Sequence, residues 1–188
     1  GGATVAWPQL GHVQDRVAAW LNPWDLADGS GFQIVQGTYA LAWGGIGGQG
    51  LGRGYGIQGL GKAFVATDSI FVIIGEELGI FGSTAVLAAF LLIAGAGFRI
   101  AMRADDPYHK LLAAGLTVSL SFQAFVILGG LLRVLPLTGI TLPFLSYGGS
   151  SLIANYVLVA LLLRTSDEVS TRAEGTARGG RVRVGTNV

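Results

Sequence analysis

Three long stretches of the chain carry no charged residue and are rich in apolar ones. They run over residues 78–98, 111–132 and 134–163. A helix needs about 20 apolar residues to cross the hydrocarbon core of a bilayer, so each stretch is long enough. One such stretch could be a buried helix of a large soluble protein, but three in succession favour a membrane protein. The pattern therefore predicts an all-α polytopic membrane protein with transmembrane helices over 69–99, 111–133 and 146–164.

The third stretch is too long for one simple helix. Pro136, Gly139 and Pro143 interrupt its first part, because proline lacks the amide hydrogen that a helix interior needs. We therefore expect a loop over 134–145 before the helix. Four small residues form the predicted helix start: Ser146, Gly148, Gly149 and Ser150. Such a start packs closely against a neighbouring helix or presents amide groups to an anion. We expect structural or positioning roles for the interrupting residues and for the helix start.

A fourth uncharged segment, 32–52, is a poor candidate for a membrane helix. It contains seven Gly and three Gln, which do not suit a helix exposed to lipid. We interpret it as an amphipathic segment that lies at the interface or re-enters the membrane without crossing it. Trp20 and Trp24 precede it and are typical of the head-group level. Residues 45–50 fit the glycine pattern of a dinucleotide site, but no strand is predicted before them, so packing and turn roles are favoured.

Composition agrees with a lipid environment. The chain is 51% hydrophobic and only 12% charged, against about 25% charged residues in an average soluble domain. These values exclude an intrinsically disordered chain and argue against a soluble globular domain. With no Cys and only two His, the chain excludes a disulfide framework, a thiolate metal site and a multi-histidine metal centre.

The positive charges gather at one end of the predicted helices. Eight of the twelve lysines and arginines lie in or beside the 100–110 loop and the 165–188 tail. The positive-inside rule makes both segments cytoplasmic, which places 1–68 and 134–145 on the extracytoplasmic side. The tail is polar and rich in Gly and Arg, so it is predicted to be disordered.

Three acidic residues stand at the start of the first predicted membrane helix: Asp68, Glu76 and Glu77. Asp68 either caps that helix or acts as a general base at the lipid–water boundary. On a straight helix Glu76 lies roughly 12 Å further along than Asp68, and Glu77 is nearly on the opposite face. A direct acid–base pair with Asp68 is therefore not expected. Because ionised groups inside a membrane are costly, we expect both glutamates to pair with groups elsewhere in the protein, in a positioning role.

Three segments, in this order, resemble the SEDS family (shape, elongation, division and sporulation), which includes FtsW, RodA and SpoVE. They are NPWDLADGSGFQIVQGTYALAWGGIGGQGLG at 22–52, TDSIFVIIGEELGIFG at 67–82 and PLTGITLPFLSYGGSS at 136–151. The last of them is highly specific, and the resemblance extends to about Arg164. The chain departs from the usual family pattern at Ser69, Ile127 and Arg133, where many members have Phe, Asn and Gly.

The resemblance implies that the chain is a C-terminal fragment, with the outer loop and helices eight to ten of a ten-helix fold in the bacterial plasma membrane. It implies polymerisation of lipid II into the glycan strands of peptidoglycan, beside a class B penicillin-binding protein that crosslinks the product. The essential loop aspartate of the family falls on Asp68, and its paired glutamates fall on Glu76 and Glu77. No nucleic-acid partner is expected.

The implied reaction is an inverting glycosyl transfer from a strand on undecaprenyl pyrophosphate to the 4-hydroxyl of lipid II. Asp68 is the expected base, or else it binds a divalent cation (Mg or Mn) at the pyrophosphate. Outward cationic side chains can assist the leaving group, and Arg53 is preferred among four candidates: Arg16, Arg53, Lys62 and Arg133. Gln33 and Gln36 are further substrate-binding candidates. Two alternatives stay open, a lipid II flippase without chemistry and a non-catalytic membrane partner of the penicillin-binding protein.

Overall fold

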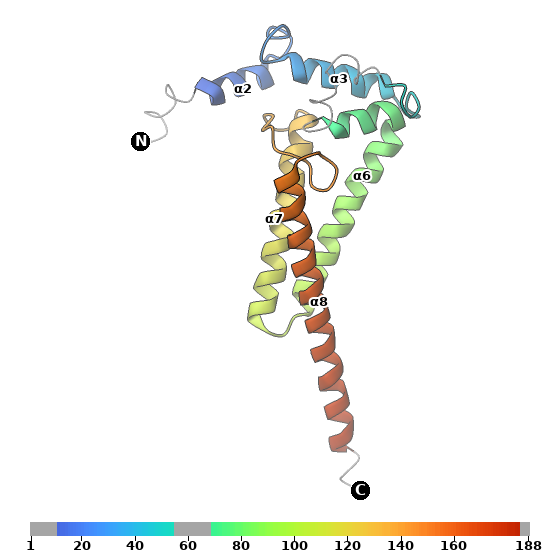
Figure 1. Ribbon diagram of the computed structural model, residues 1–188, viewed down its shortest axis with the longest axis vertical. Helices are drawn as coiled ribbons and strands as arrows, with labels where there is room; N and C mark the ends of the chain where they lie inside the picture. Colours follow the sequence, from blue (N-terminus) through green and yellow to red (C-terminus); the bar gives the residue numbers. More distant parts are fainter. Residues whose placement is uncertain (1–10, 55–68, 185–188) are drawn as a thin grey trace.

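The described part of the chain is built from helices alone. The computed structural model describes residues 11–54 and 69–184, and the side chains of its last helix as far as Arg172. Its elements are α2 (Gly11–Leu21), α3 (Phe32–Gly44), α6 (Ile70–Arg103), α7 (Pro107–Leu131) and α8 (Gly149–Val184). The long helices α6, α7 and α8 form a bundle, and α2 and α3 lie across its upper end (Figure 1). The predicted all-α class is confirmed.

Three helices are long and apolar enough to cross a membrane. They are α6, α7 and the Gly149–Arg172 part of α8, so the prediction of three such helices is confirmed. Their outward faces carry large apolar side chains, with Leu91, Leu92 and Leu111 between 72% and 74% exposed. Exposed apolar surface of this extent marks a face that contacts lipid or further apolar helices. The chain is part of a membrane protein.

The last helix extends well past its predicted end. The sequence predicts a helix over 146–164 and a disordered tail after it, but α8 continues to Val184. The structure thus continues the helix through 165–184, where the sequence predicts disorder. The side chain of Glu168 supplies a reason, since it pairs with Arg164 one turn earlier at 3.2 Å and with the ring of His109 on α7 at 2.7 Å. Contacts outside the helix stabilise it beyond what its own composition indicates.

The start of α7 is fixed by a helix cap. Asp106 has an extended backbone, and its carboxylate accepts a hydrogen bond from the Tyr108 amide at 3.2 Å. Pro107 follows at the first helical position, where its missing amide hydrogen costs nothing. The turn between α6 and α7 therefore needs only residues 104–106.

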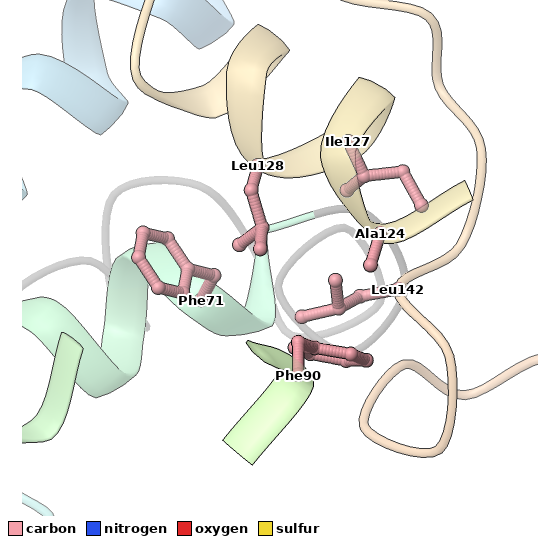
Figure 2. Packing of buried hydrophobic residues seen from close by; sticks show 6 residues of the cluster. All are labelled: Phe71, Phe90, Ala124, Ile127, Leu128 and Leu142. Atoms are coloured by element: carbon pink, nitrogen blue, oxygen red, sulfur yellow. The ribbon is translucent and has the colours of Figure 1, made fainter. Parts of the chain in front are cut away.

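A compact apolar cluster holds the upper part of the bundle together. Phe71 and Phe90 of α6 pack against three side chains of α7 and against Leu142 of the loop before α8 (Figure 2). Phe71 and Leu142 are 0% and 1% exposed. The cluster joins the start of α6, the end of α7 and the 132–148 loop, which are the segments around the candidate site.

The 32–52 segment contains a helix, α3, that is shorter than a membrane span. The 13 residues of α3 measure about 20 Å at 1.5 Å per residue, against about 30 Å for the hydrocarbon core. It lies across the upper end of the bundle, and α2 lies beside it in the same layer (Figure 1). This placement agrees with a segment that lies along the membrane surface.

The helices alternate in direction, so the basic segments meet at one end. The turn after Arg103 and the C-terminal half of α8 lie at the lower end, while α2, α3 and the 132–148 loop lie at the upper end (Figure 1). The sequence-based expectation that the 100–110 loop and the tail share one side of the membrane fits this arrangement.

Candidate functional site

The first membrane helix breaks one turn after its glutamates. Gly79 has φ 64° and ψ −154°, which is not helical, so Ile70–Leu78 forms a separate short segment of α6. The short segment lies beneath α3, and the long segment turns away down the bundle (Figure 1). The helix expected over 69–99 is therefore interrupted at Gly79 rather than straight. Glu76 and Glu77 lie on the segment before the break, at the upper end.

The glycine-rich loop after α3 makes hydrogen bonds to the backbone groups that the helix break leaves without partners. A helix end leaves carbonyl groups without an intrahelical partner. Here the carbonyls of Glu76 and Glu77 accept hydrogen bonds from the amides of Gln49 at 2.9 Å and Gly50 at 3.0 Å. The Ile80 amide in turn donates to the Gly45 carbonyl at 3.0 Å. Three backbone hydrogen bonds thus fasten the 45–50 loop to the break.

The helices α3 and α6 meet backbone to backbone. A Cβ atom added at Gly44 would overlap the carbonyl oxygen of Gly75 and lie 2.9 Å from the Cα of Glu76. At the other end of the contact, a Cβ at Gly37 would touch the Val72 side chain at 3.6 Å. Glycine is needed at Gly44 because only it permits this approach. The position of α3 is therefore set by close contact with the first segment of α6.

The glutamate side chains face the end of the glycine-rich loop. Glu76 is only 1% exposed, and its Oε2 atom lies 3.0 Å from where a Cβ of Gly54 would stand. Glu77 is half-buried beside it. Arg53, the preferred cation from the sequence, is exposed in this loop, with its side chain folded over Gly50. These three residues form one group at the C-terminal end of α3.

A second group lies at the N-terminal end of α3, where α2 is tied to the loop before α8. The Trp20 indole N–H donates to the Arg133 carbonyl at 2.9 Å. The Arg16 guanidinium donates to the carbonyls of Leu137 and Thr138. Arg133 adopts a left-handed backbone with φ 61°, and its Nε atom is buried without a hydrogen-bond partner in the described part of the chain.

A polar cavity opens between α2, the loop before α8 and the first turn of α3. Its volume is about 210 Å³, and its polar lining comes from Arg16, Ser30 and Gln33. The Nε2 atom of Gln33 is buried and has no hydrogen-bond partner among the described residues. A narrow second cavity of about 10 Å³ shares Gln33 and reaches Ser69, the residue before α6.

The proline-rich loop is held by its own hydroxyl groups. The Ser146 side chain, 2% exposed, accepts a hydrogen bond from the Leu142 amide at 2.9 Å. Thr141 donates to the Ser151 hydroxyl at 2.8 Å, and the Gln123 amide of α7 donates to the Thr141 carbonyl at 3.0 Å. These contacts shape the loop that supplies Leu137 and Gly139 to the cavity. The helix itself begins at Gly149 rather than at Ser146.

The structure therefore divides the predicted site residues between the two ends of α3. Gln33 and Arg16 line the cavity, Gln36 is half-buried one turn further along α3, and Arg53 lies at the far end. Asp68 and Lys62 lie outside the described residues. Ser30 is a cavity residue that the sequence did not indicate, because it has no local signal and joins the site only through the fold.

Metal binding by the described residues finds no support. Among the side chains that the structure describes, no three of His, Cys, Asp or Glu gather in a way that could hold an ion. The divalent cation expected at Asp68 falls outside the described residues. The residues near the cavity are donors and cations rather than carboxylates, so this part of the site suits groups rich in oxygen acceptors.

The chain is similar to known proteins over most of its length. The model of a family described as "Cell cycle protein" (FtsW/RodA/SpoVE) matches residues 2–171. The "Peptidoglycan glycosyltransferase RodA" of Mycobacterium tuberculosis strain H37Rv is 47% identical over 165 residues, which cover 88% of this chain and 34% of that protein. The "Stage V sporulation protein E" of Bacillus subtilis strain 168 is 43% identical over 155 residues, covering 80% of this chain and 41% of that protein.

A solved structure has the same fold. It is described as "Structural coordination of polymerization and crosslinking by a peptidoglycan synthase complex", and one of its chains matches with a TM-score of 0.66 and 28% identity. The match covers 89% of this chain and 45% of that one. The chain thus spans about a third to two fifths of the length of the curated relatives it matches.

Proposed function

Since the chain belongs to the FtsW/RodA/SpoVE family of cell cycle proteins, we propose that it is the C-terminal part of a peptidoglycan glycosyltransferase that polymerises lipid II. The observation that carries this proposal is the 47% identity to a protein named peptidoglycan glycosyltransferase, over 88% of this chain. The geometry supports it, because a polar cavity at the end of a lipid-facing bundle suits a substrate with a polar head and a lipid tail.

The proposed orientation follows from charge. The turn between α6 and α7 and the C-terminal half of α8 lie at the lower end of the bundle (Figure 1). The sequence around that turn carries Arg99, Arg103 and Lys110, and the tail is basic as well, so that end faces the cytoplasm under the positive-inside rule. The upper end, with α2, α3 and the cavity, then faces outward. The whole protein is proposed to be a multi-pass protein of the bacterial plasma membrane, with its active site on the extracytoplasmic face.

The proposed reaction is an inverting glycosyl transfer. The 4-hydroxyl oxygen of lipid II attacks the anomeric carbon of the donor strand, and the bond from that carbon to the pyrophosphate oxygen breaks. The hydroxyl proton passes to Asp68 as general base, and undecaprenyl pyrophosphate leaves with the electron pair. Alternatively, Asp68 holds a divalent cation that stabilises the leaving pyrophosphate. Glu76 and Glu77 position the glycine-rich loop through their backbone carbonyls.

The proposed partner is a class B penicillin-binding protein that crosslinks the new strands. The solved structural relative is described as a complex that coordinates polymerisation with crosslinking, and this description supports the proposal. The complete protein should therefore be assayed together with that partner.

The test uses the full-length protein, purified with its partner and supplied with lipid II in detergent, where no translocation is needed. The Asp68→Asn variant should form no glycan polymer at normal expression, whereas the matched Asp28→Asn variant, changed at an exposed turn residue, should keep wild-type activity. Absence of polymer from the wild type, with lipid II translocation in vesicles, would indicate a flippase. Undiminished polymer from Asp68→Asn would indicate that the catalytic base lies elsewhere or that the partner performs the chemistry.

A further inference from the structure

We propose that the cavity between α2, the first turn of α3 and the 137–139 segment is the subsite that binds the diphosphate of a polyprenyl-linked substrate. Arg16 and Gln33 are its principal ligands. This inference rests on the proposed function, and it moves the diphosphate contact from Arg53, which the sequence favours, to the opposite end of α3.

The size of the cavity indicates a part of a ligand rather than a whole one. Its volume of about 210 Å³ far exceeds the roughly 10–15 Å³ that one ordered water requires. It is below the range of about 300–1,000 Å³ that is typical of complete small-molecule sites. A disaccharide with its peptide and lipid would not fit, but a compact head group would.

The lining selects an anionic group rich in oxygen acceptors. Arg16 supplies a positive charge that makes no ion pair with the described residues, and it donates hydrogen bonds to the neutral carbonyls of Leu137 and Thr138. The Gln33 Nε2 atom is buried without a partner. A buried donor without a hydrogen bond costs about 1–3 kcal/mol of stability. A ligand oxygen that accepts from the Gln33 amide would remove this cost. The polar lining side chains are Arg16, Ser30 and Gln33, and none of them is acidic.

The aromatic surroundings of the cavity suit a lipid phosphate. The layer formed by α2 and α3 exposes aromatic side chains, with Trp24 at 50%, Tyr39 at 50% and Trp43 at 66% exposure. Exposed Trp and Tyr are characteristic of the membrane–water interface. A cavity in this layer, at the end of the apolar bundle, is placed where the diphosphate of a polyprenyl lipid lies when its tail is in the membrane.

Arg53 lacks these features. Like Arg16 it is exposed, but it lies in the loop fastened to the Glu76 and Glu77 carbonyls, and its side chain folds over Gly50. The side chains of Glu76 and Glu77 lie beside Gly54, the residue after Arg53, and their carboxylates would repel a diphosphate. The structure therefore favours Arg16 over Arg53 through surroundings that a count of cations does not reveal.

The test measures lipid binding to the full-length protein with its partner in nanodiscs. The probes are undecaprenyl pyrophosphate and, as a comparison without phosphate, undecaprenol. Arg16→Gln should lower the affinity for the diphosphate by roughly ten-fold or more, as expected for a charge-assisted hydrogen bond, and should leave undecaprenol binding unchanged. Arg16→Lys should restore part of the loss. Arg99→Gln, at the opposite end of the bundle, is the matched control and should bind like wild type.

Gln33→Met separates binding from folding. Because the Gln33 amide nitrogen has no partner in the described chain, its replacement by an apolar side chain of similar length should leave thermal stability unchanged or higher. The same variant should bind the diphosphate several-fold more weakly. A loss of stability without a change in diphosphate affinity would assign Gln33 a structural role and would overturn the proposal.

The outcomes separate this proposal from the proposed function. Polymer formation with wild-type diphosphate affinity in both Arg16→Gln and Gln33→Met would keep the function and overturn the subsite. Arg16-dependent binding of the diphosphate without any polymer from the wild type would keep the subsite and overturn the glycosyltransferase. A loss of diphosphate binding in Arg53→Gln, with none in Arg16→Gln, would place the contact at the other end of α3 and overturn the assignment.

Discussion

The break in α6 gives the sharpest prediction, because it depends on one residue. Gly79 has φ 64° and ψ −154°, in a region that is essentially restricted to glycine. A Cβ atom at this position would lie 2.5 Å from the amide nitrogen of Gly48 and 2.6 Å from the carbonyl oxygen of Ile46. Both neighbours are backbone atoms, so no change of rotamer can make room. Gly79→Ala is therefore predicted to be strongly destabilising.

The magnitude follows from two independent costs. The unfavourable backbone conformation costs about 1–3 kcal/mol for a residue other than glycine, and overpacking against fixed atoms costs about 1–3 kcal/mol more. The loop could move away instead, but it would then lose the hydrogen bonds that Gln49, Gly50 and Ile80 make across the break, at about 1 kcal/mol each. Both routes give a loss of about 2–6 kcal/mol.

The assay compares thermal unfolding and lipid II polymerisation of the full-length protein with its partner. Gly95→Ala is the matched control, since Gly95 lies in the same helix and a Cβ there would meet nothing within 4 Å. That change should stabilise the helix by about 0.5–1 kcal/mol. Gly79→Ala should unfold at a clearly lower temperature and form little polymer. Equal unfolding temperatures for the two variants would refute the close contact between the loop and the break.

Two further predictions concern the other end of the bundle. A Cβ at Gly97 would overlap the Oγ1 atom of Thr117 and lie 3.0 Å from its Cβ, so Gly97→Ala should destabilise the contact between α6 and α7 by about 1–3 kcal/mol. Gly115→Ala should not destabilise this contact, because a Cβ at Gly115 would meet open space. Equal thermal stabilities of the Gly97→Ala and Gly115→Ala variants would contradict the close contact of Gly97 with Thr117. The pKa of the Asp106 carboxyl is lowered from its ordinary value of 3.8, first by the hydrogen bond with His109 and then by that with the Tyr108 amide. A lowered pKa in the folded state adds stability that is complete above the ordinary value and is lost as the pH falls through the lowered one. The Asp106→Asn variant should therefore unfold at a lower temperature than wild type at neutral pH, and the two unfolding temperatures should converge in strong acid. A difference in unfolding temperature that stays constant with pH would argue against the ionised cap.

The membrane helices could be predicted from sequence because their signal is local. A run of about 20 uncharged, apolar residues identifies a spanning helix without knowledge of its neighbours. The break at Gly79 has no such signal, since Gly79 stands in an apolar run like Gly82 or Gly95. Its conformation depends on the 45–50 loop, about 30 residues earlier in the chain. The helical extension of α8 was missed for the same reason, because Glu168 finds its partner on α7.

The candidate site was predictable in composition but not in arrangement. The sequence identifies Gln33 and several outward cations, yet it cannot rank the cations, since each has the same charge. Arg16 differs from Arg53 in its place beside Gln33 and in its contacts with Leu137 and Thr138, more than 120 positions away. Side chains that are brought together across such separations leave no periodicity in the sequence. The ranking therefore required the fold.

The helix α3 couples the two ends of the site. Its C-terminal end is fixed by the backbone contact of Gly44 with Gly75 and Glu76, and its middle by Gly37 against Val72. The same helix carries Gln33 into the cavity and leads toward Ser69 at the start of α6. Because protein interiors deform little, a side chain at Gly44 would lift the end of α3 and also displace Gln33, two turns or more away. Gly37 and Gly44 thus set how closely α3 approaches α6, and α3 carries Gln33 into the cavity.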